Sequence, residues 1–376
     1  MSIDPDIGQA AIAQALQQAQ LAVRLSNPNP RVGCVLTNAH GRILGQGHTQ
    51  QAGGPHAEVM ALQDAATHGE STQGATAYVT LEPCSHQGRT GPCCDALMAA
   101  GVTRVVAAIS DPNPLVSGQG FARLRAAGVQ VQVLDTRSAE AVASRELNIG
   151  FFSRMLRKTP WVRMKIAASL DGTTALDNGQ SQWITGAAAR EDGHAWRARA
   201  CALLTGIGTV LEDNPRLDVR SVQTPRQPHL VVVDSRLETP MDAALFTPKR
   251  QLLIYCAVHE PAKESAMQAR GATVIHMPGP GGKVDLAAML RDLALREVNE
   301  LHVEAGAKLN GSLIREELVD EFLVYLAPKL MGPGRGMAAI GPIATLDDSL
   351  KLEFLETETV GQDLRIRARI PGRDRF

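Results

Sequence analysis

The sequence predicts an α/β protein with two domains. The chain has 376 residues, and at roughly 150 residues per domain this length corresponds to about two domains. From residue 75 onward, short apolar segments of strand character alternate with amphipathic helical segments, which indicates sheets with helices packed on their faces. A second series of such segments begins after the basic stretch 154–160. We therefore expect domains at 1–150 and 151–376.

The elements of the first domain follow from hydrophobic periodicity and from turn residues. Residues 8–25 have helical apolar spacing, and the Asn-Pro-Asn-Pro stretch at 27–30 ends that helix. Strands are expected at 32–36 and 43–47, with a turn at His40-Gly41 between them. The remaining predictions for this domain are helices at 56–66, 93–100 and 120–127, and strands at 75–81, 104–109 and 129–134.

The same criteria predict a longer series in the second domain. Strands are expected at 162–167, 201–205, 230–233, 252–255, 273–276, 301–304, 322–326 and 364–370. Helices are expected at 187–199, 285–297 and 312–317, and the Pro-Gly-Pro-Gly-Gly stretch at 278–282 is expected to be a loop.

Composition and charge exclude several classes of protein. Hydrophobic residues make up 44% of the chain and aromatic residues only 3%, so the cores must consist mostly of Ala, Val, Leu and Ile. The net charge is −1, and residues 1–150 contain nine arginines, eleven acidic residues and no lysine. Neither domain has the basic character expected of a nucleic-acid or membrane-surface protein. No apolar run approaches the ~20 residues of a membrane span, and no signal peptide is recognisable, so we expect a cytoplasmic protein.

The strongest chemical signal combines His56, Glu58, Cys84 and Cys93. An H-x-E…P-C-x-x-C pattern is typical of zinc-dependent nucleobase deaminases, in which one imidazole and two thiolates hold Zn²⁺ and leave one position for water. A carboxylate beside that water can transfer its proton to a ring nitrogen and then to the leaving amine. Here eight residues instead of two separate Cys84 from Cys93. Two alternatives stay open at this point: Cys94 as the ligand in place of Cys93, or a structural site completed by His86.

Other segments carry weaker signals. The stretches 27–34 and 45–48 are either a simple hairpin or the wall of a substrate pocket containing Asn29 and His48. In the second domain no G-x-G-x-x-G follows the first strand, but glycines at 206–208 and 306–311 stand between expected strands and helices, where phosphate binding is favourable. Glu304 ends an apolar strand, where parallel sheets place ligand-facing groups. Cys34, Cys201 and Cys256 lie in apolar runs and are expected to be inert core thiols.

These motifs together resemble the bifunctional deaminase–reductase family of riboflavin biosynthesis. The resemblance rests on His56-Ala-Glu58, the stretch 80–94 with its eight-residue spacer, and Asp111-Pro-Asn-Pro114. It continues in the order of the family through segments 165–172, 181–185, 209–215 and 303–306. It implies a cytidine-deaminase-like α/β/α sandwich followed by an α/β domain similar to dihydrofolate reductase. The last forty residues carry no motif that we can assign.

For the first domain, the resemblance implies hydrolytic removal of the 2-amino group of 2,5-diamino-6-(5-phosphoribosylamino)pyrimidin-4-one. It implies one Zn²⁺ per chain, held by His56, Cys84 and Cys93, with Glu58 as the proton shuttle. The residues expected to line the substrate site are Asn29, His48, His86 and Arg89. The planar fork of Arg89 suits a phosphate group. Gly91 stands where the family usually has a second proline.

For the second domain, the resemblance implies NADPH-dependent reduction of the ribosyl group of the deaminated product to a ribityl chain. The residues expected to contact substrate are Lys165, Ser181, Arg197, Leu217, Arg220 and Glu304, with Arg197 and Arg220 as phosphate partners. The residues expected to contact NADPH are Ala167, Trp183, Thr209, Asp213, Ser235, Gly306, Ala307, Lys308, Leu309, Asn310, Gly311 and Ser312. Taken alone, Trp183 could equally be a core or rim aromatic, Arg220 a solvated loop charge and Asp171-Gly172 a simple turn.

Two other classes of function share part of this pattern. A deaminase of RNA or DNA would use the same zinc ligands, but it needs a basic surface that the first domain lacks. A scaffold stabilised by a structural zinc would leave Glu58 without a purpose. We therefore expect an enzyme on small-molecule substrates, without nucleic-acid or membrane partners, and the family leads us to expect a homo-oligomer.

Overall fold

The structure is a computed structural model that describes residues 5–86, 91–114 and 116–376. It divides into two compact units, unit 1 (Met1–Arg157) and unit 2 (Lys158–Phe376), each built around its own sheet. The α/β class expected from the sequence is confirmed. Among the described residues, no helix has the length and apolar character needed to cross a membrane.

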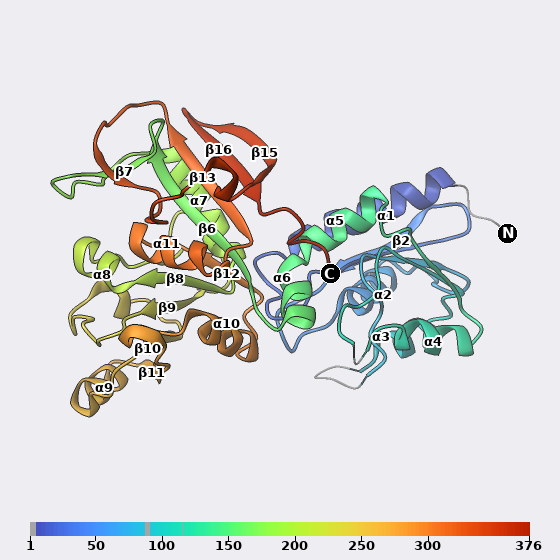
Figure 1. Cartoon of the computed structure of the whole chain (residues 1–376). Coiled ribbons are helices and arrows are strands. Elements are labelled where there is room, and N and C mark those ends of the chain that lie inside the picture. Colours follow the sequence, from blue (N-terminus) through green and yellow to red (C-terminus); the bar gives the residue numbers. More distant parts are fainter. Residues whose placement is uncertain (1–4, 87–90, 115) are drawn as a thin grey trace. The chain divides into compact units, whose positions relative to one another are not determined.

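Unit 1 consists of a five-stranded sheet with helices on both faces (Figure 1). Its elements are α1 (Pro5–Leu21), β1 (Gly33–Thr37), β2 (Ile43–His48), α2 (Ala57–Thr67), β3 (Thr76–Val79), α3 (Cys93–Ala99), β4 (Arg104–Ala107), α4 (Gln119–Ala126), β5 (Gln130–Val133), α5 (Ala139–Leu147), α6 (Ile149–Phe152) and a π-helical turn (Ser153–Arg157). The strand order is β2-β1-β3-β4-β5, with β1 antiparallel to both neighbours and β3, β4 and β5 parallel.

Alternating side chains of the strands divide the interior of unit 1 into two layers. Val35, Tyr78 and Val106 point to the face covered by α1, while their neighbours along the strands form a second core with α2, α3 and α4. A side chain on Gly33 would lie 1.9 Å from the carbonyl oxygen of Ala15 in α1, and one on Gly47 would lie 2.6 Å from the backbone of α2. These glycines allow both helices to approach the sheet closely, so the sandwich architecture expected for the first domain is confirmed.

Unit 2 contains a nine-stranded sheet that is mostly parallel. Its elements are β6 (Trp161–Ser169), β7 (Thr173–Leu176), α7 (Ala187–Arg199), β8 (Ala202–Gly206), α8 (Ile207–Asp213), β9 (His229–Val233), β10 (Leu252–Cys256), α9 (Pro261–Ala269), β11 (Ala272–His276), α10 (Leu286–Leu295), β12 (Glu300–Val303), α11 (Ala307–Arg315), β13 (Glu321–Ala327), β14 (Gly334–Gly336), β15 (Glu353–Val360) and β16 (Asp363–Arg369), with 3-10 turns at Ala244–Phe246, Pro280–Gly282 and Leu346–Asp348. The strand order is β11-β10-β9-β8-β12-β6-β13-β16-β15 (Figure 1).

Most expected elements are present, and the differences have physical reasons. Residues 139–157, for which we predicted no element, form α5, α6 and the π-helical turn, because their apolar side chains pack against the core of unit 1. The helix expected at 312–317 begins five residues earlier, at Ala307, and ends at Arg315, since Gly311 does not interrupt it. Besides α5 and α6, five further helices and strands were missed, namely β7, α8, α9, β14 and β15. The boundary between the two functional domains, expected at 150/151, stays a prediction.

The last forty residues include a hairpin of β15 and β16 that extends the sheet of unit 2 and is fastened to α7. The Asp363 carboxylate accepts the backbone N–H of Gly186, just before α7, over 2.7 Å. Arg365 donates to both carboxylate oxygens of Asp192 in α7, over 3.0 and 3.1 Å. The C-terminal segment therefore holds the helix that covers one face of the sheet.

A buried ion network lies under α7, near the amino ends of β6, β12 and β13. Arg163 is 1% exposed and donates to Glu300 over 2.8 Å and to Glu321 over 2.7 Å, while its guanidinium lies 4.7 Å from the ring centre of Trp196. Glu300 also pairs with Arg199, and Arg369 with Glu321. Although burial acts in the opposite direction, Arg163, Arg367 and Arg369 lower the pKa of Glu321 to about 2. The network joins three strands, α7 and β16.

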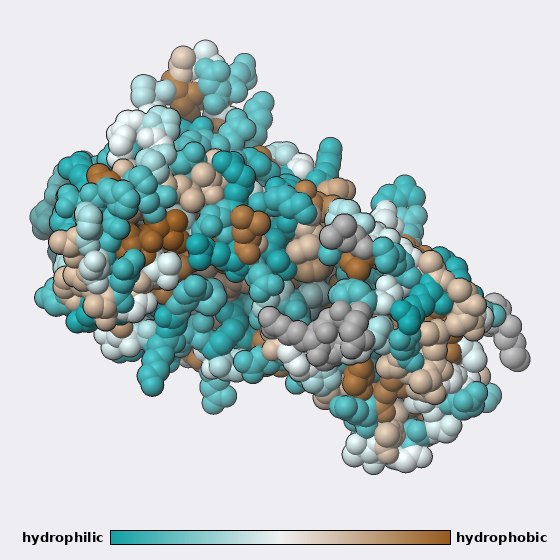
Figure 2. Space-filling view, turned by 90° about the horizontal axis from the view of Figure 1, so that it is seen from below, coloured by the Kyte–Doolittle hydropathy of each residue, from teal (hydrophilic) through white to brown (hydrophobic). Residues whose placement is uncertain are grey.

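The surface is predominantly polar on the face drawn in Figure 2, where hydrophobic residues occur as small patches among hydrophilic ones. Single exposed apolar residues are ordinary for a folded protein. The described residues visible in this view therefore form no extended apolar surface.

The buried network leads to a prediction about stability. We expect Arg163→Met to lower the free energy of unfolding of unit 2 by about 3 kcal/mol, because removing one partner leaves buried carboxylates uncompensated. All three tryptophans lie in unit 2, so their fluorescence during urea unfolding reports on this unit alone. Arg335→Met, which removes an exposed pair with Glu212, should change stability by less than about 0.5 kcal/mol. Equal effects of the two variants would contradict the prediction.

Candidate functional site

In unit 1, three separate segments bring His56, Cys84 and Cys93 together. His56 is the N-cap residue of α2, Cys93 is the first residue of α3, and Cys84 lies in the segment that follows β3. Their ligand atoms all lie within 4.8 Å of one another. The three residues meet because α2 and α3 both begin at the edge of the sheet where β3 ends.

The geometry of this cluster fits a tetrahedral zinc ion. His56 Nδ1 lies 3.6 Å from the Sγ of Cys84 and 3.4 Å from the Sγ of Cys93. Zinc bonds of ordinary length at a tetrahedral angle separate nitrogen and sulfur by about 3.6 Å. The backbone N–H of Cys93 also donates to the Cys84 sulfur over 3.4 Å, which favours a thiolate there.

The structure bears on both alternatives for the ligand set. The Cys94 thiol is fully buried and donates to the carbonyl oxygens of Pro83 and Gly120, so it points away from His56. Among the described residues, the group of side chains that could hold a metal ion consists of His56, Cys84 and Cys93. His86 is exposed and does not belong to this group. A three-residue ligand set leaves the fourth tetrahedral position open, as a catalytic site requires.

Glu58 lies beside the cluster, in the first turn of α2. Its side chain is 3% exposed, and its carboxyl group interacts electrostatically with His56 and both thiols. Burial raises the pKa of Glu58 to about 7, and the negative charge of Cys84 adds to this effect. A carboxyl group that can hold or release a proton near neutrality is suited to general acid–base chemistry.

The structure describes three of the four other expected deaminase residues. His48 is half-buried at the end of β2, the strand on which α2 packs, and burial lowers its pKa. Asn29 lies before β1, which pairs with β2 so that Gly33 stands opposite His48. His86 is exposed in the segment after Cys84. Arg89 lies outside the described residues.

In unit 2, the structure brings Lys165, Arg197 and Glu304 together. Arg197 in α7 binds the Glu304 carboxylate through two of its nitrogens, one of them over 2.8 Å. Lys165 in β6 places its Nζ 3.8 Å from Glu304, which directly follows β12. Although burial acts in the opposite direction, these two cations hold the pKa of Glu304 well below its ordinary range. Glu304 is therefore an ionised, largely buried carboxylate.

The expected substrate residues Leu217 and Arg220 lie on the loop after α8. Arg220 is about half exposed and pairs with Asp218 over 2.8 Å, and its backbone N–H donates to Nδ1 of His194 in α7. Burial, with Arg197 and Arg220 adding to it, lowers the pKa of His194 to about 4, so this imidazole is a neutral acceptor. Leu217 is buried and its carbonyl oxygen accepts from Arg250.

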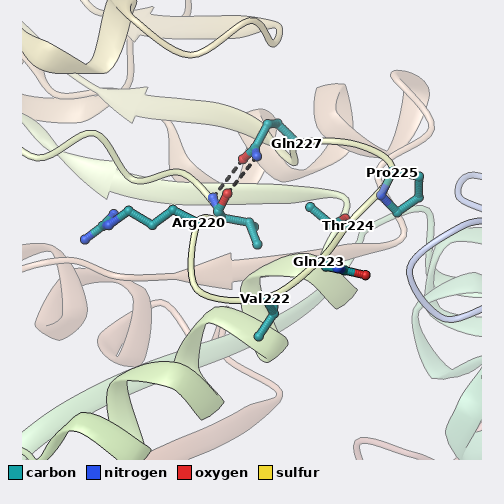
Figure 3. A pocket seen from close by; sticks show the side chains of 7 residues that line it. Arg220, Val222, Gln223, Thr224, Pro225 and Gln227 are labelled. Atoms are coloured by element: carbon teal, nitrogen blue, oxygen red, sulfur yellow. Dashed lines mark hydrogen bonds between the residues drawn. The ribbon is translucent and has the colours of Figure 1, made fainter.

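An open hollow of ≈ 590 Å³ lies along this loop (Figure 3). Gln227 closes the loop, since its amide accepts the N–H of Val219 over 2.7 Å and donates to the Val219 carbonyl over 2.8 Å. Figure 3 shows the Arg220 side chain extending away from the other side chains that line the hollow. The Arg220 guanidinium is thus accessible to an anionic ligand.

The expected cofactor residues gather at the carboxyl ends of the parallel strands. Gly206 and Gly306 are the N-cap residues of α8 and α11, which follow the neighbouring strands β8 and β12. Thr209 Oγ1 lies 3.7 Å from the place that a side chain on Gly306 would occupy, so the two helix starts are adjacent. Ser235 follows β9, and its hydroxyl accepts the N–H of Val284. Two helix N-termini side by side are suited to a pyrophosphate.

The rest of this set is placed as follows. Ala167 lies in β6 opposite Tyr325, and Asp213 accepts a hydrogen bond from Ser181 over 3.5 Å. Trp183 is 63% exposed, with the Arg190 guanidinium 4.6 Å from its ring centre, so it is a rim residue and not a core residue. The α11 residues among the expected set are Ala307, Lys308, Leu309, Asn310, Gly311 and Ser312. Asp171 accepts the backbone N–H groups of Met331 and Gly332, so the Asp171-Gly172 turn fastens that loop.

Sequence reasoning missed the residues that support this site. Tyr325 is buried below Lys165, whose Nζ lies 5.9 Å from the ring centre, and its hydroxyl donates to Asp192 over 2.6 Å. His302 is fully buried, with Nε2 3.5 Å from Glu304. One signal in the sequence could have indicated part of this supporting structure. Arg365, Arg367 and Arg369 alternate along a predicted strand, which places all three side chains on one face of the strand.

Comparisons with known proteins agree with this architecture. Residues 160–366 match the family model of the RibD C-terminal domain, and residues 6–109 match the cytidine and deoxycytidylate deaminase zinc-binding region. The riboflavin biosynthesis protein RibD of Escherichia coli is 41% identical over 362 residues, covering 94% of this chain and 96% of that protein. The Aquifex aeolicus protein of the same name is 40% identical, with coverages of 94% and 95%.

Two solved structures match nearly the whole chain. The structure of Acinetobacter baumannii RibD matches with a TM-score of 0.88 at 36% identity, covering 97% of this chain and 99% of that one. A deaminase/reductase from Thermotoga maritima matches with a TM-score of 0.85 at 29% identity and the same coverages. The resemblance noted from the sequence is therefore confirmed.

The two units and their sites define a bifunctional enzyme, with a zinc-dependent deaminase domain followed by an NADPH-dependent reductase domain. The chain belongs to the RibD family of riboflavin biosynthesis.

The ligand geometry leads to a prediction about zinc content. We expect Cys84→Ser and Cys93→Ser to lose most bound zinc, because a hydroxyl group replaces a thiolate ligand. Cys94→Ser should retain about one zinc per chain, because the Cys94 thiol contacts carbonyl oxygens and not the ligand cluster. Metal analysis of the purified variants measures this directly. Zinc loss in Cys94→Ser together with retention in Cys93→Ser would instead make Cys94 the ligand.

Proposed function

We propose that unit 1 deaminates 2,5-diamino-6-(5-phosphoribosylamino)pyrimidin-4-one, and that unit 2 then reduces the ribosyl group of the product to ribityl. The product of the two steps is 5-amino-6-(5-phosphoribitylamino)uracil. The observation that carries this proposal is the convergence of His56, Cys84 and Cys93 beside buried Glu58. Relatives over nearly the whole chain are named as riboflavin biosynthesis proteins, and the Thermotoga maritima protein is named for these two activities.

In the proposed deamination, His56, Cys84 and Cys93 hold the zinc ion. Bound zinc supplies a water molecule of near-neutral pKa as the nucleophile. Glu58 would carry the first proton of this water to a ring nitrogen. It would then carry the second proton, from the hydroxyl group added to the attacked carbon, to the amino group, which leaves as ammonia. Its burial supports this role, because a carboxylate shielded from bulk water returns the proton to substrate and not to solvent.

The remaining residues of unit 1 bind the substrate in this proposal. Asn29 and the neutral imidazole of His48 can hydrogen-bond the pyrimidine, since both lie at the β1–β2 edge on which α2 packs. His86 and Arg89 follow Cys84 in the chain and are assigned to the phosphoribosyl end. Arg89 provides the guanidinium for phosphate.

In the proposed reduction, Lys165, Ser181, Leu217, Arg220 and Glu304 contact the deaminated product. Ionised Glu304 accepts hydrogen bonds from the sugar hydroxyls. The accessible guanidinium of Arg220 binds the phosphate, which its partial exposure beside the hollow supports. Arg197 has its fork engaged by Glu304, so its main contribution is to orient that carboxylate.

NADPH binds in this proposal along the carboxyl ends of β8, β9 and β12. NADPH supplies the hydride that reaches C1′ of the sugar in its open, imine-like form. The helix starts at Gly206 and Gly306 receive the pyrophosphate, and Thr209 lies between them. The other contacts are assigned to Ala167, Trp183, Asp213, Ser235 and the first turns of α11.

The assembly and the compartment are also proposals. We infer a homo-oligomer because β15 stands at the edge of the sheet and presents unpaired backbone groups, with Phe354 75% exposed on it. A cytoplasmic location is supported by six free cysteines, two of them in the zinc cluster, since a reducing compartment preserves thiols.

The deaminase assignment predicts the behaviour of Glu58→Gln. We expect this variant to bind zinc and to lose deamination by about 10²-fold to 10⁴-fold, because the proton shuttle is removed. The assay supplies the undeaminated ribotide with NADPH and follows NADPH oxidation, which requires both sites in sequence. Oxidation should return fully when pre-deaminated substrate is given. Unchanged oxidation from the undeaminated ribotide would refute the role of Glu58.

The reductase assignment predicts a complementary effect of Glu304→Gln. We expect reduction of the pre-deaminated substrate to fall about 10-fold to 100-fold, since a charged acceptor of hydrogen bonds becomes neutral and two buried cations lose their partner. Ammonia release from the undeaminated ribotide should be unchanged. Glu212→Gln, which alters an exposed pair in the same unit, serves as the control. A variant that reduces substrate normally would exclude Glu304 from the site.

A further inference from the structure

We propose that Glu82 is a positioning residue for the zinc ligand Cys84, and that it acts by holding the start of α4 against the segment 82–85. The inference deepens the proposed deaminase and depends on that function only for its activity readout. Neither Glu82 nor α4 belongs to the ligand cluster.

The contacts of Glu82 form a complete clamp. Its side chain is 5% exposed, and its two carboxylate oxygens accept four backbone N–H groups. One oxygen accepts from Asp111 over 3.2 Å and Gly118 over 3.0 Å, and the other from Gly120 over 2.9 Å and Phe121 over 3.3 Å. A buried carboxylate that accepts several N–H groups is held firmly in one orientation.

Three of these donors belong to the beginning of α4. The first N–H groups of a helix have no partner within the helix, and the positive end of its dipole favours a negative charge. The N-cap residue Gly118 has no side chain to supply this charge, so Glu82 provides it from a distant part of the chain.

Further contacts tie α4 to both sides of Cys84. On the side before Cys84, a side chain on Gly120 would lie 2.1 Å from the Pro83 carbonyl oxygen, so the two backbones are in close contact. On the side after it, Arg123 of α4 donates to the carbonyl oxygen of Ser85 over 2.9 Å and also pairs with Asp95 of α3. The thiol of Cys94 in α3 bridges the carbonyl oxygens of Pro83 and Gly120.

Cys84 needs this support because it has left the sheet. The paired residues of β3 end at Val79, whereas His56 and Cys93 are each fixed at the start of a helix that packs on the sheet. Of the three ligands, Cys84 alone lies neither in a helix nor at the start of one. The clamp from Glu82 to α4 therefore sets the position of the third ligand atom before zinc binds, and it lowers the cost of organising the site.

Glu82→Gln tests this inference in the full-length chain. The amide NH2 group would face backbone N–H donors, so two of the four hydrogen bonds are lost with little change in volume. We expect the affinity for zinc, measured by competition with a chromogenic chelator, to fall at least about tenfold, the usual effect of residues that orient metal ligands. We also expect an altered visible spectrum of the cobalt-substituted protein and a lower kcat for deamination with little change in KM.

The matched control is Glu70→Gln, which removes the exposed pair with Arg42 in the same unit and should leave all three readouts unchanged. Reduction of pre-deaminated substrate should be normal in both variants. If Glu82→Gln fails to fold, Arg123→Gln removes only the contact with Ser85 and the pair with Asp95, and a threefold or larger loss of zinc affinity is expected.

The outcomes separate this inference from the proposed function. The inference would be overturned if Glu82→Gln had the zinc affinity and the cobalt spectrum of the natural chain. The same holds for Arg123→Gln where that variant replaces Glu82→Gln. This outcome does not depend on what the enzyme deaminates. A natural chain that shows no deamination would refute the proposed function, whereas a loss of zinc affinity in Glu82→Gln would still support the positioning role.

Discussion

Buried charge is the constraint on which both units depend. A charged group in the interior is unfavourable unless partners neutralise it, so each such group determines which segments must meet. In unit 1, Glu82 brings the start of α4 to the segment of Cys84. In unit 2, Arg163 pairs with both Glu300 and Glu321 near the amino ends of the strands. At the carboxyl end of β12, Glu304 pairs with Arg197 and Lys165. The apolar cores give each sheet its stability, but these polar contacts give it a single arrangement.

The helix α7 shows how these two groups of ion pairs in unit 2 depend on one another. Its residues Trp196 and Arg199 contact the buried network, while Arg197 reaches Glu304 and Asp192 supports Tyr325 below Lys165. The hairpin of β15 and β16 secures this helix through Asp363 and Arg365. The last forty residues, which carry no recognisable motif, therefore fix the position of α7 and with it that of Arg197.

How much could be predicted from the sequence follows from how each feature is encoded. The zinc cluster was predictable because its geometry is demanding, and His56, Cys84 and Cys93 stand in short motifs of diagnostic residue types. Strands and long helices were predictable because apolar periodicity is local, as for α7, whose bounds match the expected 187–199. The edge strand β15 could not be predicted, since it is mostly exposed and lacks an apolar face. Glu82 could not be assigned a role either, because its partners lie 29 to 39 residues away.

This difference explains why the two halves of one enzyme are unequally readable. A metal requires particular side chains in fixed directions, so its site leaves a strong trace in the sequence. A dinucleotide at the ends of parallel strands is bound largely by backbone N–H groups at helix starts, and these leave only glycines as a trace. In the function that we propose, Gly206 and Gly306 are such a trace, and each alone is ambiguous. They become informative when the fold places the two helix starts side by side, with Thr209 beside Gly306. For sites of this kind the topology of the sheet carries the information, and the sequence motif follows from it.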